Sequence, residues 1–184
     1  PAIMVVMMHI LETFTGGEHT KQIINHGYLA VDFFFLLSGF VIGYAYDDRW
    51  GKMSLRDFFK RRLIRLHPMI VAGMLIGTIT FFFQDSPFFP LISETPVEKL
   101  LLLTLIGITL LPVPTSLDIR GWQEMYPLNG PAWTLFFEYV VNILYGLFIR
   151  RFNRLLFSLL VIVAGAALVH LAVTSASGDL IGGW

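Results

Sequence analysis

The chain contains several separate apolar runs, each close to the length of a helix that crosses a membrane. Such a helix needs about 20 residues, because it rises about 1.5 Å per residue through a hydrocarbon core about 30 Å thick. Of the 184 residues, 55% are hydrophobic and only 14% are charged, whereas about a quarter of the residues of a soluble domain are charged. The pattern predicts an all-α fold, a polytopic transmembrane helix bundle.

About six membrane segments are expected, with one amphipathic interfacial helix between the second and the third. The segments are predicted at residues 2–14, 28–46, 69–83, 97–111, 133–149 and 155–173. The first is too short to span, and the chain begins without Met. We therefore expect residues 1–184 to be a single membrane domain, truncated at both ends. There is no cysteine, which excludes a disulfide framework and a thiolate metal site.

The basic residues indicate which connectors lie in the cytoplasm. Seven of the thirteen lysines and arginines fall within residues 49–65 and three within 150–154, and the positive-inside rule places both stretches in the cytoplasm. Three full crossings between them would put them on opposite sides. Either residues 150–154 break this rule or one segment does not cross. Segment 97–111 would span only about 22 Å, so we expect it to be re-entrant or steeply shielded. Connectors 85–96 and 113–132 would then lie on the same side.

The interfacial helix is predicted to follow Ser54, which can cap it together with Asp57. Its apolar residues recur at helical spacing, and most of its basic residues lie on the other side. The basic side includes Arg61, Arg62 and Arg65, whose guanidinium groups can converge on one anion. That anion is either a membrane lipid headgroup or the phosphate of a nucleotide.

Ionisable and polar residues inside the apolar segments are the other candidates for chemistry, because such groups are costly in a membrane. His9 lies in the first segment with Glu12 one turn later, and imidazole can take a proton from a hydroxyl. Glu138 and Asn142 form a polar stripe on the fifth segment and must face protein or a cavity. The alternative for both sets is a structural hydrogen bond between helices.

Four stretches together resemble the membrane-bound acyltransferase 3 family. They are IMVVMMH, which ends at His9, then VDFFFLLSGF, FFKRRLIRLHP and PAWTLFFE, in the order that the family has them. The family also has an arginine eleven residues before its histidine, a position that falls before Pro1. Its members have about ten spanning helices, so the resemblance implies that this chain is part of a larger domain.

The resemblance implies an integral membrane enzyme that moves an acyl group, usually acetyl, from cytoplasmic acyl-CoA to a hydroxyl of a sugar, cell-surface glycan or glycolipid. Arg62 and Arg65 match the family's basic pair, and Arg61 would help them bind the acyl-CoA phosphates. His9 matches the family's histidine and would act as general base on the acceptor hydroxyl, oriented by Glu12 or by a carboxylate elsewhere. Glu138 and Trp133 would shape the site, and Asn142 belongs to the same stripe.

The expected partners are the lipid bilayer and a carbohydrate or glycolipid acceptor, without nucleic acid and without a metal. The expected location is the cytoplasmic (inner) membrane. A transporter or channel in which His9 and Glu138 relay protons or bind a solute is the rival interpretation. The arginine cluster distinguishes the two, since a transporter does not require it.

Overall fold

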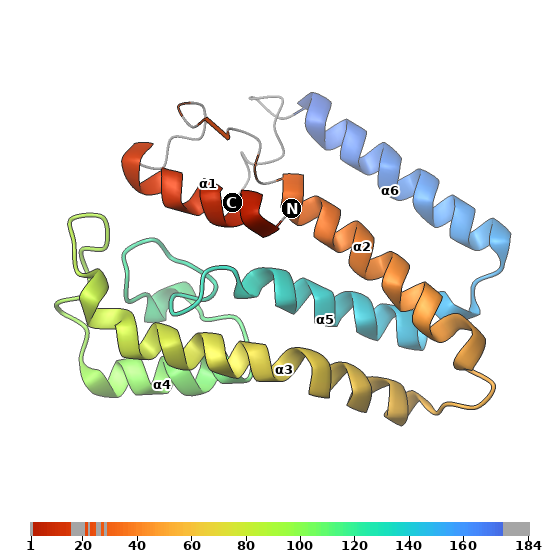
Figure 1. The fold of residues 1–184 in the computed structure, drawn as a ribbon, viewed down its shortest axis with the longest axis horizontal. Helices are drawn as coiled ribbons and strands as arrows, with labels where there is room; N and C mark the ends of the chain where they lie inside the picture. Colours follow the sequence, from red (N-terminus) through yellow and green to blue (C-terminus); the bar gives the residue numbers. More distant parts are fainter. Residues whose placement is uncertain (1, 16–20, 22, 25–26, 28, 175–184) are drawn as a thin grey trace. The chain divides into compact units, whose positions relative to one another are not determined.

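A computed structural model describes residues 2–15, 21, 23–24, 27 and 29–174. Every regular element in these ranges is a helix, and they contain no strand, which confirms the all-α prediction. The α-helices are α1 (Ala2–Thr15), α2 (Leu29–Tyr46), α3 (Leu55–Thr80), α4 (Val97–Ile108), α5 (Ala132–Leu147) and α6 (Arg154–Thr174) (Figure 1).

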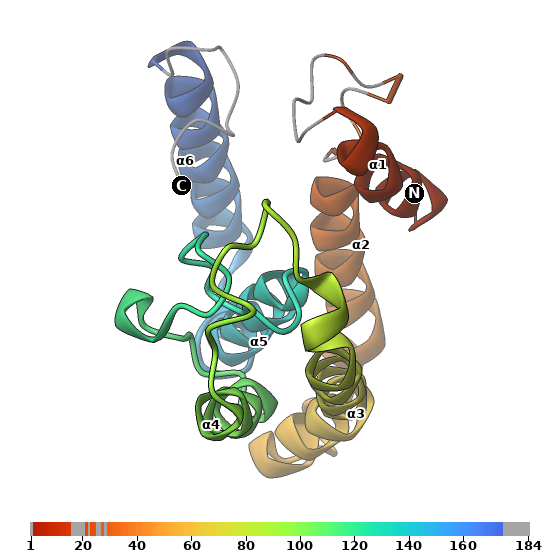
Figure 2. The ribbon, with the colours of Figure 1, turned by 90° about the vertical axis from the view of Figure 1, so that its left-hand side faces the viewer.

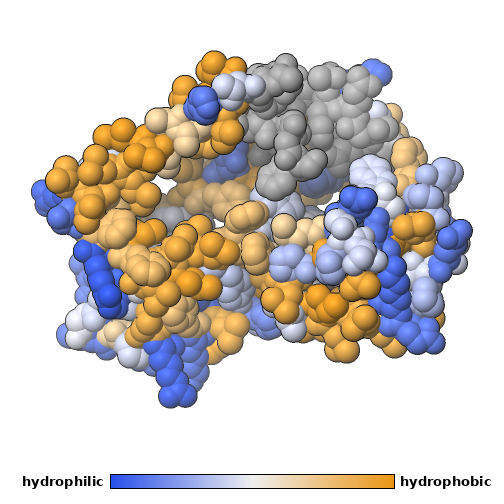
Figure 3. Space-filling view, turned by 180° about the vertical axis from the view of Figure 1, so that it is seen from behind, coloured by the Kyte–Doolittle hydropathy of each residue, from blue (hydrophilic) through white to orange (hydrophobic). Residues whose placement is uncertain are grey.

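Four helical stretches are long and apolar enough to cross a membrane. They are Leu29–Arg49, Leu55–Gln84, Ala132–Arg151 and Arg154–Thr174. Helices α1 and α4 have only 14 and 12 residues, so the described residues show four candidate spans where about six were expected. Large hydrophobic side chains are exposed along these helices, and they cover much of the face in Figure 3. The protein is a multi-pass membrane protein.

The separate interfacial helix is a prediction that the structure corrects. Residues 55–80 form one continuous helix, α3, with Pro68 in its interior. The expected cap is present: Ser54 accepts a hydrogen bond from the backbone N–H of Asp57, and the Asp57 carboxylate accepts one from the N–H of Ser54. Proline removes one backbone hydrogen bond, but membrane helices tolerate this loss where neighbouring helices support them. The basic turns are therefore the first part of a spanning helix.

The chain divides into two compact units, Pro1–Ile143 and Leu144–Trp184. In the first unit, α4 runs back along α3, as Figures 1 and 2 show. Their contact buries Ile70, Met74 and Leu103. It also includes one polar bridge, a 2.7 Å hydrogen bond between the hydroxyls of Thr78 and Thr104. The second unit contains the end of α5 and α6.

Residues 109–131 return from the end of α4 almost entirely without helix. The turn at Leu110 has a positive φ of 59°, and the buried Tyr126 hydroxyl donates a 2.9 Å hydrogen bond to the Leu110 carbonyl. The returning chain lies so close to α3 that a Cβ on Gly77 would overlap the Leu128 carbonyl oxygen. Glycine is required here because only a residue without a side chain admits this contact.

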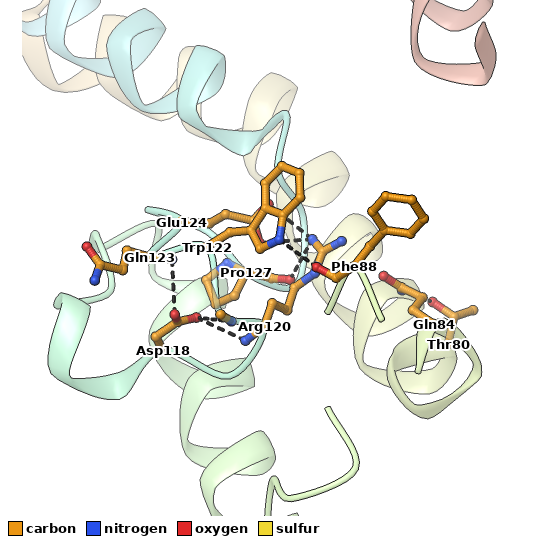
Figure 4. A network of polar contacts seen from close by, with 10 residues as sticks. Thr80, Gln84, Phe88, Asp118, Arg120, Trp122, Gln123, Glu124 and Pro127 are labelled. Carbon is orange, nitrogen blue, oxygen red and sulfur yellow. Dashed lines mark hydrogen bonds and ion pairs between the residues drawn. The ribbon is translucent and has the colours of Figure 1, made fainter. Parts of the chain in front are cut away.

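The connectors before and after α4 contact each other, as the close view in Figure 4 shows. The Trp122 indole N–H donates to the Phe88 carbonyl at 2.5 Å. The Arg120 guanidinium lies 3.8 Å from the centre of the Phe89 ring. The two connectors that we expected on one side of the membrane are therefore packed together, and the re-entrance of segment 97–111 itself stays a prediction.

Candidate functional site

A cleft of about 330 Å³ lies between α2 and α5 in the first unit. Its lining residues are Phe35, Ser38, Gly39, Trp133, Phe137, Glu138 and Val141. The rings of Phe35 and Trp133 are tilted by 53° to each other, with centroids 6.0 Å apart, and the Phe137 ring lies 6.1 Å from that of Trp133. Two predicted site residues, Trp133 and Glu138, thus lie in one aromatic cavity.

Glu138 is the charged group of this cleft, and residues from two other helices hold it. Its Oε1 accepts a 2.6 Å hydrogen bond from Arg62 Nη2 of α3 and a 3.0 Å bond from Ser38 Oγ of α2. The Arg62 side chain is 3% exposed and that of Glu138 is 20% exposed. An ion pair that is also a short hydrogen bond is among the stronger polar contacts in proteins. Three helices therefore meet at one carboxylate oxygen.

Several buried polar atoms around this ion pair have no hydrogen-bond partner. They are Arg62 Nε, the Tyr139 hydroxyl and Asn142 Oδ1. Asn142, the other member of the predicted stripe, uses its Nδ2 to donate a 2.6 Å bond to the backbone carbonyl of Glu138. Unsatisfied buried polar atoms are uncommon in native proteins, and three of the five among the described residues lie near this ion pair.

The three arginines expected to bind one anion do not share a surface. Arg62 is buried in a stripe of α3 with Phe58, Leu66 and Ile70, and together the four recur every four residues. Arg61 and Arg65 are exposed. The expected convergence of Arg62 with Arg65 is therefore not present, because the Arg62 guanidinium is engaged by Glu138.

The histidine expected as a base lies on a different helix. His9 is exposed on α1, which packs against α2. Glu12 lies in the same helix, but its side chain is outside the described residues, so its expected role in orienting His9 stays a prediction. No group of three His, Asp or Glu side chains that could hold a metal ion occurs among the described residues.

Ser38 is the site residue that the sequence did not single out for chemistry. A serine beside Gly39 in an apolar helix is typical of close helix packing. One signal could have identified Ser38: an ionisable residue such as Glu138 in a membrane helix needs hydrogen-bond donors from the protein. A hydroxyl on a neighbouring helix is one of the few available.

The family of acyltransferase domains matches this chain over residues 2–178. The chain belongs to this family. Its relatives include "Protein 2 in picA locus" of Rhizobium radiobacter, 33% identical over 79% of this chain and 75% of that protein. "Acyltransferase MdmB" of Streptomyces mycarofaciens is 30% identical over 76% of this chain and 33% of that protein. No solved structure matches this chain.

A shorter match links the acyltransferase to a protein of Staphylococcus aureus (strain COL) named "Putative O-acetyltransferase SACOL0978". The two are 42% identical over 71 residues, which is 36% of this chain and 12% of that protein. The chain thus spans three quarters of the first relative, one third of the second and about an eighth of the third. Acyl transfer is the chemistry that the family and these names support.

The geometry gives this acyltransferase one anionic group in an aromatic cavity. Oε1 of Glu138 is occupied by its two donors, while Oε2 has no hydrogen-bond partner among the described residues. A carboxylate oxygen in this state can accept a hydrogen bond from a hydroxyl. The flanking rings offer apolar surface to the rest of a ligand.

Proposed function

We propose that this acyltransferase moves an acyl group, usually acetyl, from cytoplasmic acyl-CoA to a hydroxyl of a sugar, cell-surface glycan or glycolipid at the cytoplasmic membrane. The observation that carries the proposal is the Glu138 carboxylate, which lines an aromatic cleft between two membrane helices of an acyltransferase-family chain. Burial of a carboxylate in such a cavity is costly, and a hydroxyl ligand gives its second oxygen a partner.

The donor end of the reaction is proposed at the first turns of α3. Arg56, Lys60, Arg61 and Arg65 are exposed there, and Arg61 and Arg65 are four residues apart on one side of the helix. Arginine binds phosphate with two parallel hydrogen bonds. This pair suits the phosphates of acyl-CoA at the membrane surface, with the acyl chain directed into the bundle.

The acceptor end is proposed in the cleft, where Trp133 and Phe137 provide rings and Glu138 accepts a hydrogen bond from an acceptor hydroxyl next to the one that reacts. In the transfer step the reacting acceptor oxygen forms a bond with the acyl carbon while the carbon–sulfur bond of the thioester breaks. His9 takes the proton of the reacting hydroxyl as general base. The leaving CoA thiolate receives that proton, so the step is balanced without a metal.

The test supplies acetyl-CoA labelled in the acetyl group to membranes that contain the full-length protein. We expect label in a carbohydrate or glycolipid fraction, and we expect the Glu138→Gln variant to lose about 100-fold in rate, because the acceptor is no longer held in position for the reaction. Membranes without the protein are the control. Release of CoA without a labelled acceptor would contradict the proposed acceptor class, and no consumption of acetyl-CoA would contradict the proposed donor.

A further inference from the structure

We infer that Arg62 has a different role from its neighbours on α3: it is an internal counter-ion that, together with Ser38, positions Glu138 in the cleft. The acyl-CoA phosphates then bind to Arg61 and Arg65. Arg62 and Ser38 are positioning residues in this assignment. The inference rests on the proposed function for the identity of the ligands, but the ion pair and its consequences can be measured without any transfer.

The first step of the argument is burial. The Arg62 side chain is 3% exposed and lies in the buried stripe of α3 with Phe58 and Leu66. A phosphate could reach its guanidinium only if the 2.6 Å bond to Glu138 were broken. That would leave the half-buried Glu138 carboxylate without its counter-ion, which is unfavourable.

The second step is the face of the helix. Residues 62 and 65 are separated by three positions, so at 3.6 residues per turn their directions differ by about 60° around the helix axis, and burial is what distinguishes them. Arg62 belongs to the buried stripe of α3, whereas Arg65 is exposed. Arg61 is four residues from Arg65 and is exposed with it. The two exposed arginines can therefore bind one anion together, while Arg62 pairs with Glu138 inside the protein.

The third step is the geometry of the carboxylate. Arg62 and Ser38 both donate to Oε1, from α3 and from α2 respectively. Two donors on one oxygen fix the orientation of the carboxylate, and Oε2 is left without a partner among the described residues. Ser38 and Glu138 both line the cleft, so the fixed carboxylate can present Oε2 to a hydroxyl there.

The test of the counter-ion is a double-mutant cycle in the full-length protein, with Arg62→Gln, Glu138→Gln and the double variant. Thermal stability in detergent and binding of labelled CoA are measured for each. We expect either single variant to lose stability and the double variant to recover most of it, since the buried charges are removed together. CoA affinity of the double variant should stay within about threefold of wild type.

Arg65→Gln is the matched arginine variant, and it should weaken CoA binding about ten- to a hundredfold with little loss of stability. If the double variant instead lost CoA affinity as severely as Arg65→Gln, Arg62 would be a phosphate ligand and the inference would be wrong. Stability and CoA binding can be measured even if the wild-type protein transfers no acetyl group, so a failure of this inference is distinct from a failure of the proposed function.

The test of Ser38 separates positioning from packing. We expect Ser38→Ala to lower kcat about tenfold with the KM for acetyl-CoA unchanged, and Ser38→Thr, which keeps a hydroxyl, to restore most of the rate. Thr78→Val is the control, because it removes another hydroxyl hydrogen bond between membrane helices, away from the cleft. Equal losses in Ser38→Ala and Ser38→Thr, or no loss in Ser38→Ala, would overturn the positioning role.

Discussion

At the scale of single residues, the basic turns of α3 show that neighbouring arginines can have unrelated surroundings. Arg62 is buried against Glu138, while Arg61 and Arg65 are exposed. A buried guanidinium needs a carboxylate partner, because an unpaired buried charge is costly, and an exposed one is available to a ligand or a lipid headgroup. Whether the exposed pair binds a nucleotide phosphate or only anionic lipid can be decided by substitution.

Arg65→Ala should weaken acyl-CoA binding about ten- to a hundredfold, because a charge-assisted hydrogen bond to phosphate contributes about 1.5–3 kcal/mol. Arg65→Lys should rescue only part of the affinity, since lysine cannot form the two parallel bonds. Equilibrium binding of labelled CoA measures both. Arg49→Ala, which removes an exposed arginine outside α3, is the control, and an unchanged affinity in Arg65→Ala would make this turn a lipid anchor.

His9→Gln should abolish transfer and leave CoA binding intact. Glutamine keeps hydrogen-bonding capacity but cannot take a proton at neutral pH, so a general base would be lost. Single-turnover transfer and CoA binding, measured on the same preparation, check the two parts. His170→Gln, a second exposed histidine in an apolar helix, should keep normal turnover. Near-normal turnover of His9→Gln would show that the histidine is structural.

At the scale of elements, the connector after α4 is ordered by one carboxylate. Asp118 accepts hydrogen bonds from the backbone N–H groups of Arg120, Gly121 and Gln123, at 2.9, 3.1 and 3.0 Å (Figure 4). Burial raises the pKa of the Asp118 carboxyl, but the backbone hydrogen bonds outweigh burial and hold that pKa below its ordinary value of 3.8. The charged form therefore stabilises the loop.

Asp118→Asn should destabilise this connector by about 1 kcal/mol at neutral pH, a value kept small by solvent screening. Because the folded pKa is lowered, the stabilisation is complete above pH 3.8 and is lost as the pH falls through the lower folded value. Hydrogen exchange of residues 118–124 at pH 7 and near pH 3 should show a difference between wild type and variant that shrinks in acid. Asp85→Asn, which changes an exposed carboxylate of the other connector, should show no such difference.

The return of the chain along α3 depends on Gly77. Gly77→Ala should destabilise the protein by about 1–3 kcal/mol, because the new Cβ would overlap the backbone carbonyl of Leu128, which cannot rotate away. Gly73→Ala is the matched control, since its Cβ would meet the movable side chain of Asn129. Thermal unfolding in detergent compares the two, and equal losses would contradict the backbone contact.

At the scale of the whole molecule, the question is how often the chain crosses the membrane between its two basic stretches. Helix α4 has 12 residues and spans about 18 Å, which is short of a core near 30 Å. The connectors on either side of α4 contact each other. Non-helical backbone such as 109–131 is tolerated at membrane depth only against protein or a cavity, and here it packs on α3.

Single cysteines at Ser93, Ser116 and Lys52, in a chain without native cysteine, should report this topology. All three positions are exposed, and Lys52 avoids the cap at Ser54. An impermeant thiol reagent added outside should label 93 and 116 and leave 52 protected. Labelling of 93 without 116 would mean that α4 crosses and that residues 150–154 lie outside.

The sequence by itself determined the helical class, the membrane setting, the cap of α3 and the family, because each depends on local composition, spacing or order along the chain. It also indicated that Glu138 and Asn142 share a stripe. It predicted that a new membrane segment begins at residue 69, with Pro68 in its first turn, where proline is favoured, whereas α3 continues through Pro68.

Only the tertiary structure decided which groups meet. Arg62 and Glu138 are 76 positions apart, and Ser38 and Glu138 are 100 positions apart. No local pattern relates residues at such separations. Helix packing buries Arg62 and turns it from an apparent phosphate ligand into the partner of a carboxylate, because a charge removed from water must be paired within the protein.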